Sequence, residues 1–211
     1  ILINTDIDII DLKDPLKGAL GRLEERDIID IIKFIDKKKL TSSTVGDLPN
    51  NEALISHNVN EISATEVDFI KIGVYDNFYI NTLCKIKSSK KLIAVFFADV
   101  FLPTESEIKT LKTSGFSGVM VDTSNKKLGN LFAHTSSSEI SNFLEIAKKL
   151  DLLTGVAGSI NETHIAEIVK LNPNYMGFRG ALCIDKTVRN SEISKISVNN
   201  IINLVNKLKH N

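Results

Sequence analysis

Charged residues stand inside or at the ends of short apolar runs, where charge is uncommon. Asp11 and Lys13 end the first run, Lys71 lies within another, Asp122 closes a further one and Asp99 directly follows one more. Residues two apart in a strand share one face of a sheet, so Asp11 and Lys13 lie on the same face. A lone buried ammonium costs several kcal/mol unless it is paired or neutral. We therefore expect these lysines and aspartates to meet in one site.

Two lysines in apolar surroundings suit Schiff-base chemistry. A neutral lysine amine condenses with a carbonyl group, and the resulting imine is an electron sink for making carbon–carbon bonds. At the reference pKa of about 10.4 only ~0.04% of a lysine is neutral at pH 7, whereas a pKa of about 7.5 makes roughly a quarter neutral. Burial and a second ammonium nearby both lower the pKa of a lysine. The aspartates would position the amines and carry protons.

Glycine-containing turns follow the last two apolar runs. Gly158 and Ser159 come after one run, and Arg179 and Gly180 come at the end of the next. Glycine lets a phosphate approach the backbone N–H groups closely, and the serine hydroxyl and the arginine guanidinium add further donors. We expect these four residues to bind a substrate phosphate. The alternative, that the glycines only turn the chain, stays open.

Other kinds of site leave no sign in the sequence. The four histidines are scattered, which gives no clustered metal ligands. There is no G-x-S-x-G elbow, no G-x-G-x-x-G fingerprint and no P-loop. Cys84 and Cys183 are too few for a disulfide framework and have no evident catalytic partner, so we expect both to be unreactive.

An alternation of strand-like and helix-like segments positions the candidate residues. Short β-branched runs predict strands, and apolar spacing of helical period predicts the helices between them. Parallel neighbours need crossover connections, so this alternation favours a parallel α/β sheet. The predicted strands are 7–13, 40–45, 68–74, 92–98, 118–122, 152–157 and 175–179, and the predicted helices are 27–37, 51–64, 77–86, 105–114, 138–149, 162–171 and 197–209.

The regular spacing of the units, roughly 25–30 residues, favours a TIM (β/α)8 barrel over an open doubly wound sheet. One unit is then unaccounted for, and we expect residues 1–4 to be the tail of the helix after an absent first strand. Counting that strand as the first places Lys13, Lys71, Asp122 and Arg179 on even strands, whose inward side chains share layers. The four charged groups should meet near the carboxyl-end mouth of the barrel.

Composition limits the possible classes of protein. The chain has 211 residues, 43% of them hydrophobic, and a formal net charge of zero. We expect residues 1–211 to form a single catalytic domain, because this length does not force a split. Zero net charge gives no basic surface for nucleic acid, and no apolar run approaches the ~20 residues of a membrane helix. With two cysteines and no signal peptide at its start, we expect a cytoplasmic protein.

Eight short motifs include most of the candidate residues. They are DIIDLKDP (8–15), GALG (18–21), TVGD (44–47), DFIKIG (68–73), VDT (121–123), LF (131–132), AGSI (157–160) and RGA (179–181). In this order and spacing they resemble the (5-formylfuran-3-yl)methyl phosphate synthases, over nearly the whole chain from about Asp6 to Arg189. This family is known from methanogens and methylotrophic bacteria, where it starts the furan unit of methanofuran or of its bacterial analogue.

The resemblance implies a TIM-barrel lyase. Such an enzyme condenses two molecules of glyceraldehyde 3-phosphate, with loss of phosphate and water, to 4-(hydroxymethyl)-2-furancarboxaldehyde phosphate. The resemblance makes Lys13 the Schiff-base lysine and Lys71 the proton acceptor, and it gives Asp11 and Asp122 supporting roles.

Two points of the resemblance stay open. Lys126 matches a further catalytic lysine, but the adjacent Lys127 leaves that assignment undecided. The family's first strand and most of its first helix have no counterpart in the sequence. A barrel open there would expose unpaired strand edges, so we expect the segment to be missing from the sequence rather than from the protein.

Two other functions remain possible. A class I aldolase or an isomerase acting on triose phosphates could use the same lysines and phosphate loops. A non-catalytic sensor of a phosphate ligand could use Arg179 and the glycines, but it has little use for Lys13. We expect a small-molecule substrate, glyceraldehyde 3-phosphate, and a homo-oligomer of undefined order. We expect no cofactor, no metal, and no nucleic-acid or membrane partner.

Overall fold

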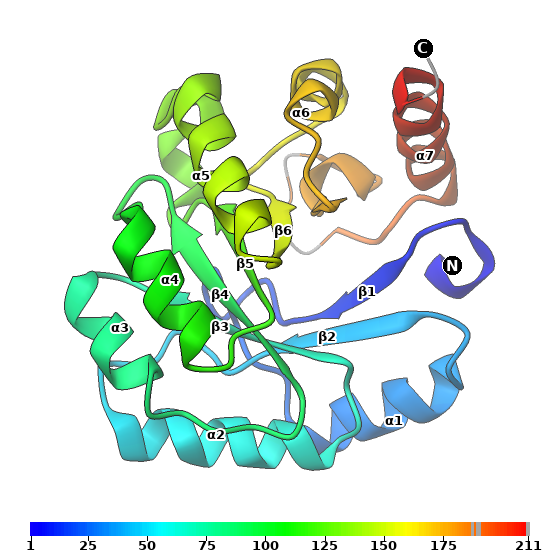
Figure 1. The fold of residues 1–211 in the computed structure, drawn as a ribbon. Helices are drawn as coiled ribbons and strands as arrows, with labels where there is room; N and C mark the ends of the chain where they lie inside the picture. The colour runs from blue at the N-terminus through cyan, green and yellow to red at the C-terminus, as the bar shows by residue number, and fades with distance from the viewer. Residues whose placement is uncertain (187, 189–190, 210–211) are drawn as a thin grey trace.

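A computed structural model describes residues 1–186, 188 and 191–209 (Figure 1). All seven predicted strands and all seven predicted helices are confirmed, with boundaries within three residues of the prediction. The strands are β1 (Ile9–Leu12), β2 (Leu40–Thr44), β3 (Phe69–Val74), β4 (Lys91–Phe97), β5 (Gly118–Asp122), β6 (Leu153–Val156) and β7 (Tyr175–Met176). The helices are α1 (Glu25–Ile35), α2 (Glu52–Ala64), α3 (Asn77–Leu83), α4 (Glu105–Thr113), α5 (Ser137–Lys149), α6 (Ile165–Leu171) and α7 (Lys195–Lys209). Short 3-10 turns are η1 (Leu2–Asn4), η2 (Lys126–Leu128), η3 (Leu131–Ala133), η4 (Glu162–His164) and η5 (Gly180–Leu182).

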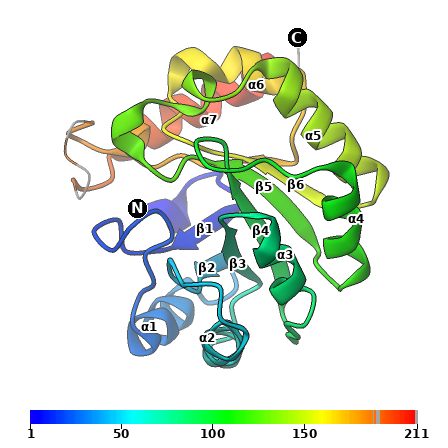
Figure 2. The same cartoon turned by 90° about the vertical axis from the view of Figure 1, so that its left-hand side faces the viewer.

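The seven strands form one parallel sheet in chain order, from β1 to β7. The sheet is curled, and the helices lie outside the curl (Figures 1 and 2). Within the described residues β1 and β7 are the two edges of the sheet and do not pair. The α/β fold is therefore confirmed as a curled parallel sheet, whereas closure into an eight-stranded barrel stays a prediction. The turn η1 lies where the sequence predicts the tail of a helix.

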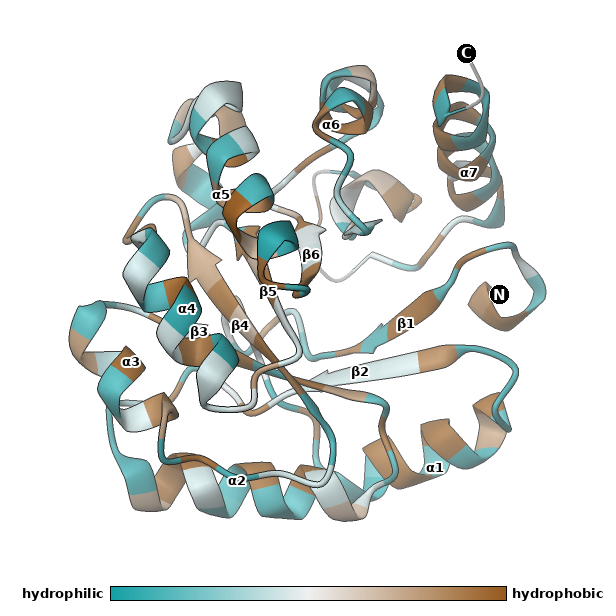
Figure 3. Cartoon of the chain, in the orientation of Figure 1, coloured by the Kyte–Doolittle hydropathy of each residue, from teal (hydrophilic) through white to brown (hydrophobic). Residues whose placement is uncertain are grey.

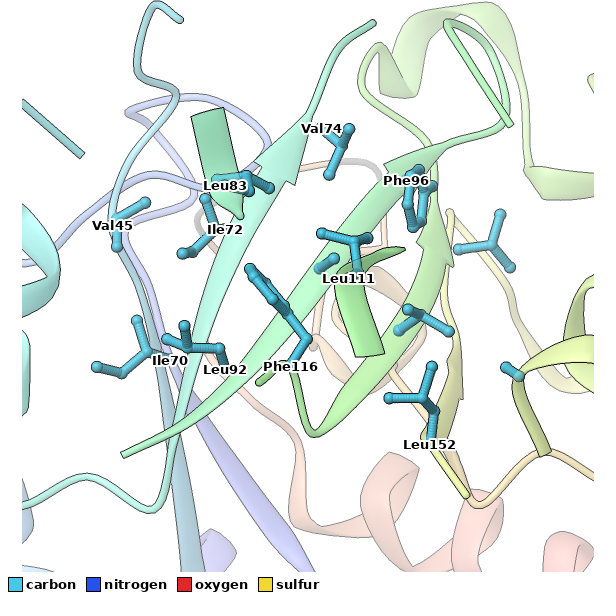
Figure 4. Packing of buried hydrophobic residues seen from close by; sticks show 14 of the residues in the cluster. Val45, Ile70, Ile72, Val74, Leu83, Leu92, Phe96, Leu111, Phe116 and Leu152 are labelled. Atoms are coloured by element: carbon cyan, nitrogen blue, oxygen red, sulfur yellow. The ribbon is translucent and has the colours of Figure 1, made fainter. Parts of the chain in front are cut away.

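The main apolar core lies between the sheet and the helices. Alternate strand residues such as Ile70 and Ile72 point outward and are at most 1% exposed. They pack with side chains from other strands and from the helices, including Leu83 and Leu111 (Figure 4). The helices are hydrophobic on the side toward the sheet and hydrophilic on the other (Figure 3). Burying each such side chain stabilises the fold by about 1.5–3 kcal/mol, which holds the strands in place.

The other face of each strand points into the curl, and we call it the inner face. A second apolar cluster, which includes Phe69, Ile93 and Met120, lies on this face. Strand register places Asp11 opposite Ser42 and Thr44 opposite Lys71, so all four belong to this face. The predicted facing of Asp11 and Lys71 is thereby confirmed.

Two polar clasps join neighbouring strands at their amino ends. The N–H and hydroxyl groups of Thr41 donate to Oδ2 of Asp68 at 2.7 and 3.0 Å, and Asp68 donates its N–H to the Thr41 carbonyl at 3.1 Å. On the far side of the sheet, the N–H and hydroxyl groups of Thr154 both donate to Oδ1 of Asn174 at 2.8 Å. Asn174 returns an N–H bond to the Thr154 hydroxyl at 3.1 Å. The clasps fix β2 against β3 and β6 against β7.

Among the described residues, none of the helices combines the length and the apolar character of a membrane span.

Candidate active site

An ion pair between a buried lysine and a partly exposed aspartate joins β1 to β3 across the inner face. Lys71 Nζ lies 2.5 Å from Oδ1 of Asp11, and the Lys71 side chain is 9% exposed against 33% for Asp11. Ser42, on the strand between them, donates its hydroxyl to the same carboxylate oxygen at 2.6 Å. We call Asp11 and Lys71 the strand pair. Three neighbouring strands therefore build it.

The strand pair has perturbed protonation. Burial lowers the pKa of Lys71, as does the nearby ammonium of Lys13, and together they outweigh the Asp11 and Asp122 carboxylates, which raise it. Burial raises the pKa of Asp11, but the charges of Lys71 and Lys13 and the hydrogen bonds from Lys71 and Ser42 bring it below its usual value. Asp11 is thus an anion beside an amine that releases its proton more readily than an ordinary lysine. Such an amine can act as a base.

Lys13 directly follows β1 on the same inner face. Its Nζ donates a hydrogen bond to the carbonyl of Ala19 at 3.2 Å. Its charge influences both members of the strand pair. The structure therefore brings Lys13, Asp11 and Lys71 together, as the sequence predicts.

A second ion pair joins the last residue of β5 to the loop that follows it. Lys126 Nζ donates to Oδ1 of Asp122, which is 5% exposed at the end of β5. Lys126 also donates to the carbonyl and the hydroxyl of Thr123, at 2.5 and 3.0 Å. The neighbouring Lys127 is exposed, and its backbone N–H donates to the Asn125 side chain. Of the two lysines, Lys126 is the one that contacts Asp122, and its catalytic role stays a prediction; we call Asp122 and Lys126 the loop pair.

Asp99, which follows β4, anchors the loop that carries Lys126. Its carboxylate accepts the N–H groups of Ser124 and Asn125 at 2.7 and 2.8 Å and the Ser124 hydroxyl at 2.7 Å. Burial raises the pKa of Asp99, but these hydrogen bonds hold it below its usual value. The sequence places Asp99 at the mouth without indicating this anchoring role.

The turn after β6 packs beside the loop pair. Gly158 has φ +113°, and a Cβ there would lie 3.1 Å from Cγ2 of Thr123. The Gly158 carbonyl accepts the N–H of Leu131 at 2.8 Å. Within the described residues, no hydrogen bond uses the N–H groups of Ser159 or Gly180. These groups can donate to a phosphate, so phosphate binding at Gly158, Ser159 and Gly180 stays a prediction.

Arg179 is engaged elsewhere. Its guanidinium donates to the Ser191 carbonyl at 3.3 and 3.4 Å and to Sγ of Cys183, whose thiol donates to the Arg179 carbonyl at 3.3 Å. The side chain thus holds the segment after β7, a role the sequence does not indicate. Binding of phosphate by Arg179 also stays a prediction. Cys183 and Cys84 are both free thiols.

Tyr175 on β7 is an inner-face residue that sequence reasoning missed. It pairs in register with Gly155 on β6, and a Cβ on Gly155 would lie 2.3 Å from Cζ of Tyr175. Burial raises the pKa of its phenol, as do the carboxylates of Asp11 and Asp122. Gly155 leaves room for the tyrosine ring, but their pairing depends on strand register and could not be read from the sequence. No group of three or more potential metal ligands occurs among the described residues.

Comparisons with known proteins agree on one family. A profile described as 4-HFC-P synthase matches residues 1–202. The (5-formylfuran-3-yl)methyl phosphate synthase of Methanococcus aeolicus is 28% identical over 211 residues, covering 93% of this chain and 90% of that protein. The synthase of the same name from Methanocaldococcus jannaschii is 29% identical over 203 residues, covering 89% and 86%.

Solved structures resemble the fold. The 3-hexulose-6-phosphate synthase of Salmonella typhimurium superposes with a TM-score of 0.66 at 12% identity, over 96% of this chain and 88% of that one. Another 3-hexulose-6-phosphate synthase gives 0.61 at 14% identity, over 94% and 87%. At these identities the likeness shows a shared α/β architecture alone.

Proposed function

The chain belongs to the 4-HFC-P synthase family, and we propose that it makes 4-(hydroxymethyl)-2-furancarboxaldehyde phosphate from two molecules of glyceraldehyde 3-phosphate. The reaction would run through a Schiff base on Lys13. The observation that carries the proposal is the meeting of Lys13 with the strand pair on one inner face. Balancing the formulas, two triose phosphates give one furan phosphate, one inorganic phosphate and two water molecules.

The first step is imine formation. The neutral amine of Lys13 attacks the aldehyde carbon of one triose phosphate, and the aldehyde oxygen leaves as water. Lys71 then takes the proton from C2 of the imine, a task that suits its lowered pKa. The resulting enamine electrons expel the phosphate from C3. Asp11 holds the Lys71 amine in place throughout.

The second step joins the two trioses. In the product the carbon that bears the phosphomethyl group is joined to C3 of the imine-bound triose, so C2 of the second triose phosphate must form the new bond. C2 of the second triose loses its proton, which the neighbouring aldehyde makes acidic, and adds to C3 of the unsaturated imine left by the loss of phosphate, while C2 of that imine takes up a proton. Ring closure through oxygen and loss of two hydroxyl groups as water complete the furan. Hydrolysis of the imine frees the aldehyde and returns Lys13. The loop pair, Asp122 and Lys126, supplies and accepts protons at these later steps.

Phosphate binding would orient both substrates. The turn at Gly158 and Ser159 packs against Thr123, beside the loop pair, and Gly180 opens the turn after β7. Free backbone N–H groups there can hold a phosphate without any charged side chain. Holding both substrates in this way makes the bimolecular step effectively unimolecular, which lowers its entropic barrier.

The decisive experiment is an ultraviolet scan of the purified protein with glyceraldehyde 3-phosphate alone. A furan aldehyde absorbs in the near ultraviolet, and we expect its band to grow with time. Borohydride added during turnover should leave a mass adduct on the peptide that contains Lys13. Substrate consumption without a furan band would favour an aldolase or isomerase, and tight binding without turnover would favour a sensor. An active preparation with no adduct on Lys13 would refute this lysine as the nucleophile.

A further inference from the structure

The loop between β1 and α1 presents a carbonyl group to Lys13. Asp14 donates its N–H to the carbonyl of Gly21 at 2.9 Å, which closes residues 14–21 into a compact loop. The Ala19 carbonyl of this loop accepts the hydrogen bond from Lys13 Nζ at 3.2 Å. The position of this loop therefore decides where the amine of Lys13 is held.

Asp47, on the loop after β2, grips this loop from outside. Its two carboxylate oxygens lie 3.2 and 3.4 Å from the N–H of Leu20, which donates to them. Gly18 has φ +110°, and a Cβ there would lie 1.9 Å from Oδ2 of Asp47, so the loop packs directly on the carboxylate. The Thr44 hydroxyl adds a bond to the Leu20 carbonyl at 2.8 Å. Among the described residues, Asp47 is the acceptor of the Leu20 N–H.

Tyr75, just after β3, fixes Asp47 in turn. Its hydroxyl donates to Oδ1 of Asp47 at 2.6 Å, and its ring packs on Phe97 of the inner face with centroids 5.1 Å apart. A Cβ on Gly73 would lie 2.9 Å from both the Tyr75 hydroxyl and Cδ1 of Leu20, so the three residues are in close contact. Burial and the Asp47 carboxylate raise the pKa of the Tyr75 phenol, which keeps it a donor.

We infer that Asp47 and Tyr75 are positioning residues for Lys13. They hold the 14–21 loop so that the Ala19 carbonyl takes one N–H of the lysine and turns the rest of the amine toward the inner face. Three loops, after β1, β2 and β3, thus cooperate to aim one nitrogen. An amine held in this way loses less freedom when it attacks a carbonyl. The inference rests on the proposed function, because the orientation of Lys13 matters only if Lys13 is the nucleophile.

The test compares Tyr75→Phe with Tyr79→Phe. The first removes only the hydroxyl that holds Asp47. The second removes a matched hydroxyl from α3 that donates to the Leu48 carbonyl, in the same loop as Asp47 but without a bond to Asp47. Two quantities are measured in each protein: amide hydrogen exchange in the peptide covering residues 14–21, and the rate of borohydride trapping at Lys13 with saturating glyceraldehyde 3-phosphate.

We expect Tyr75→Phe to exchange faster in the 14–21 peptide and to trap the imine roughly ten-fold more slowly, the effect of losing one hydrogen bond to a charged acceptor. Its KM should change less than its kcat, and Tyr79→Phe should leave the trapping rate within about two-fold of the unsubstituted protein. Asp47→Asn keeps one acceptor oxygen, so its trapping rate should lie between those of Tyr75→Phe and Tyr79→Phe.

Each other outcome has a definite meaning. Unchanged exchange or unchanged trapping in Tyr75→Phe overturns the positioning role, and so does an equal loss in Tyr79→Phe, which would indicate general loosening of the loop after β2. Absence of an adduct on Lys13 in the unsubstituted protein overturns the proposed function itself, and the positioning role with it. The unsubstituted control therefore separates the two failures.

Discussion

The strand pair and the loop pair use the same two residue types but are built in opposite ways. Asp11 and Lys71 come from strands separated by β2, and the Lys71 side chain is 9% exposed. Asp122 and Lys126 are four residues apart, and the Lys126 side chain is 24% exposed. The first pair depends on the register of three strands and the second on the shape of one loop.

The contrast separates two kinds of task. A lysine buried on a strand loses water and has its pKa lowered, which suits a base that must act at one fixed atom. A lysine on a short loop can adjust its position, which suits proton transfer at several atoms in turn. We therefore expect changes to Lys13 and the strand pair to slow imine formation and the first proton transfer. Changes to the loop pair should slow the later steps.

The largest effect is expected at Lys13, which lies beside the strand pair. In Lys13→Arg the positive charge remains but a guanidinium cannot form the imine. Furan formation should fall by about 10⁴-fold or more, with the borohydride adduct lost and the melting temperature little changed. Activity within ten-fold of the unsubstituted protein would show that Lys13 is not the nucleophile.

Lys71→Gln should come next. Without the base, furan formation should fall by about 10²–10⁴-fold, while an adduct still forms on Lys13. In the unsubstituted protein kcat/KM should rise with pH as Lys71 loses its proton. Because its pKa is lowered, the plateau should be reached below the ordinary lysine value of about 10.4. The same ascending limb in Lys71→Gln would exclude Lys71 as its source.

Lys126→Gln tests the loop pair. We expect furan formation to fall by about 10–100-fold, while imine trapping at Lys13 keeps its rate. Lys127→Gln is the matched control, because Lys127 is the next residue and its side chain is exposed. The activity of this variant should stay within about two-fold of the unsubstituted protein. Slower trapping in Lys126→Gln would mean that the loop pair also acts in imine formation. The assignment of the two pairs to different steps would then be wrong.

The smallest effect is expected from Asp99→Asn. An amide has one acceptor oxygen in place of two, so the bonds to Ser124 and Asn125 weaken and the Lys126 loop loosens. Activity should fall by roughly three- to ten-fold, with faster amide exchange in residues 123–128 and unchanged imine trapping. Loosened exchange with full activity would show that the loop pair tolerates movement.

Sequence alone could predict the elements and much of the site, because period and alternation are local properties. The facing of Asp11 and Lys71 follows from the two-residue period of a strand. Their direct contact does not, because it depends on how β1, β2 and β3 are aligned. The sequence likewise could not show that Arg179 donates to Ser191 and Cys183. These contacts depend on the path of the chain after β7, which has no local sequence pattern.

Other site features escaped because they depend on loops. Asp99 and Asp47 are both aspartates after strands, yet each accepts N–H groups from a different loop. A loop's path is set by many weak contacts and has no period of its own. Lys126 was indicated by family resemblance alone, and the structure supplies the physical reason for preferring it to Lys127: Lys126 reaches Asp122, whereas Lys127 is exposed.

The two polar clasps, Thr41 with Asp68 and Thr154 with Asn174, lie at the amino ends of the strands, and Asp68 stands three residues before Lys71. A slip of one residue would turn Lys71 outward among the helices, and the clasp beside β3 opposes that slip. The alignment of Lys71 is thus fixed by hydrogen bonds at the amino ends of the strands, whereas the loops that carry Asp47 and Lys126 follow the carboxyl ends. New loops could accordingly be grafted after the carboxyl ends of the strands while the amino ends, which fix the strand alignment, stay unchanged.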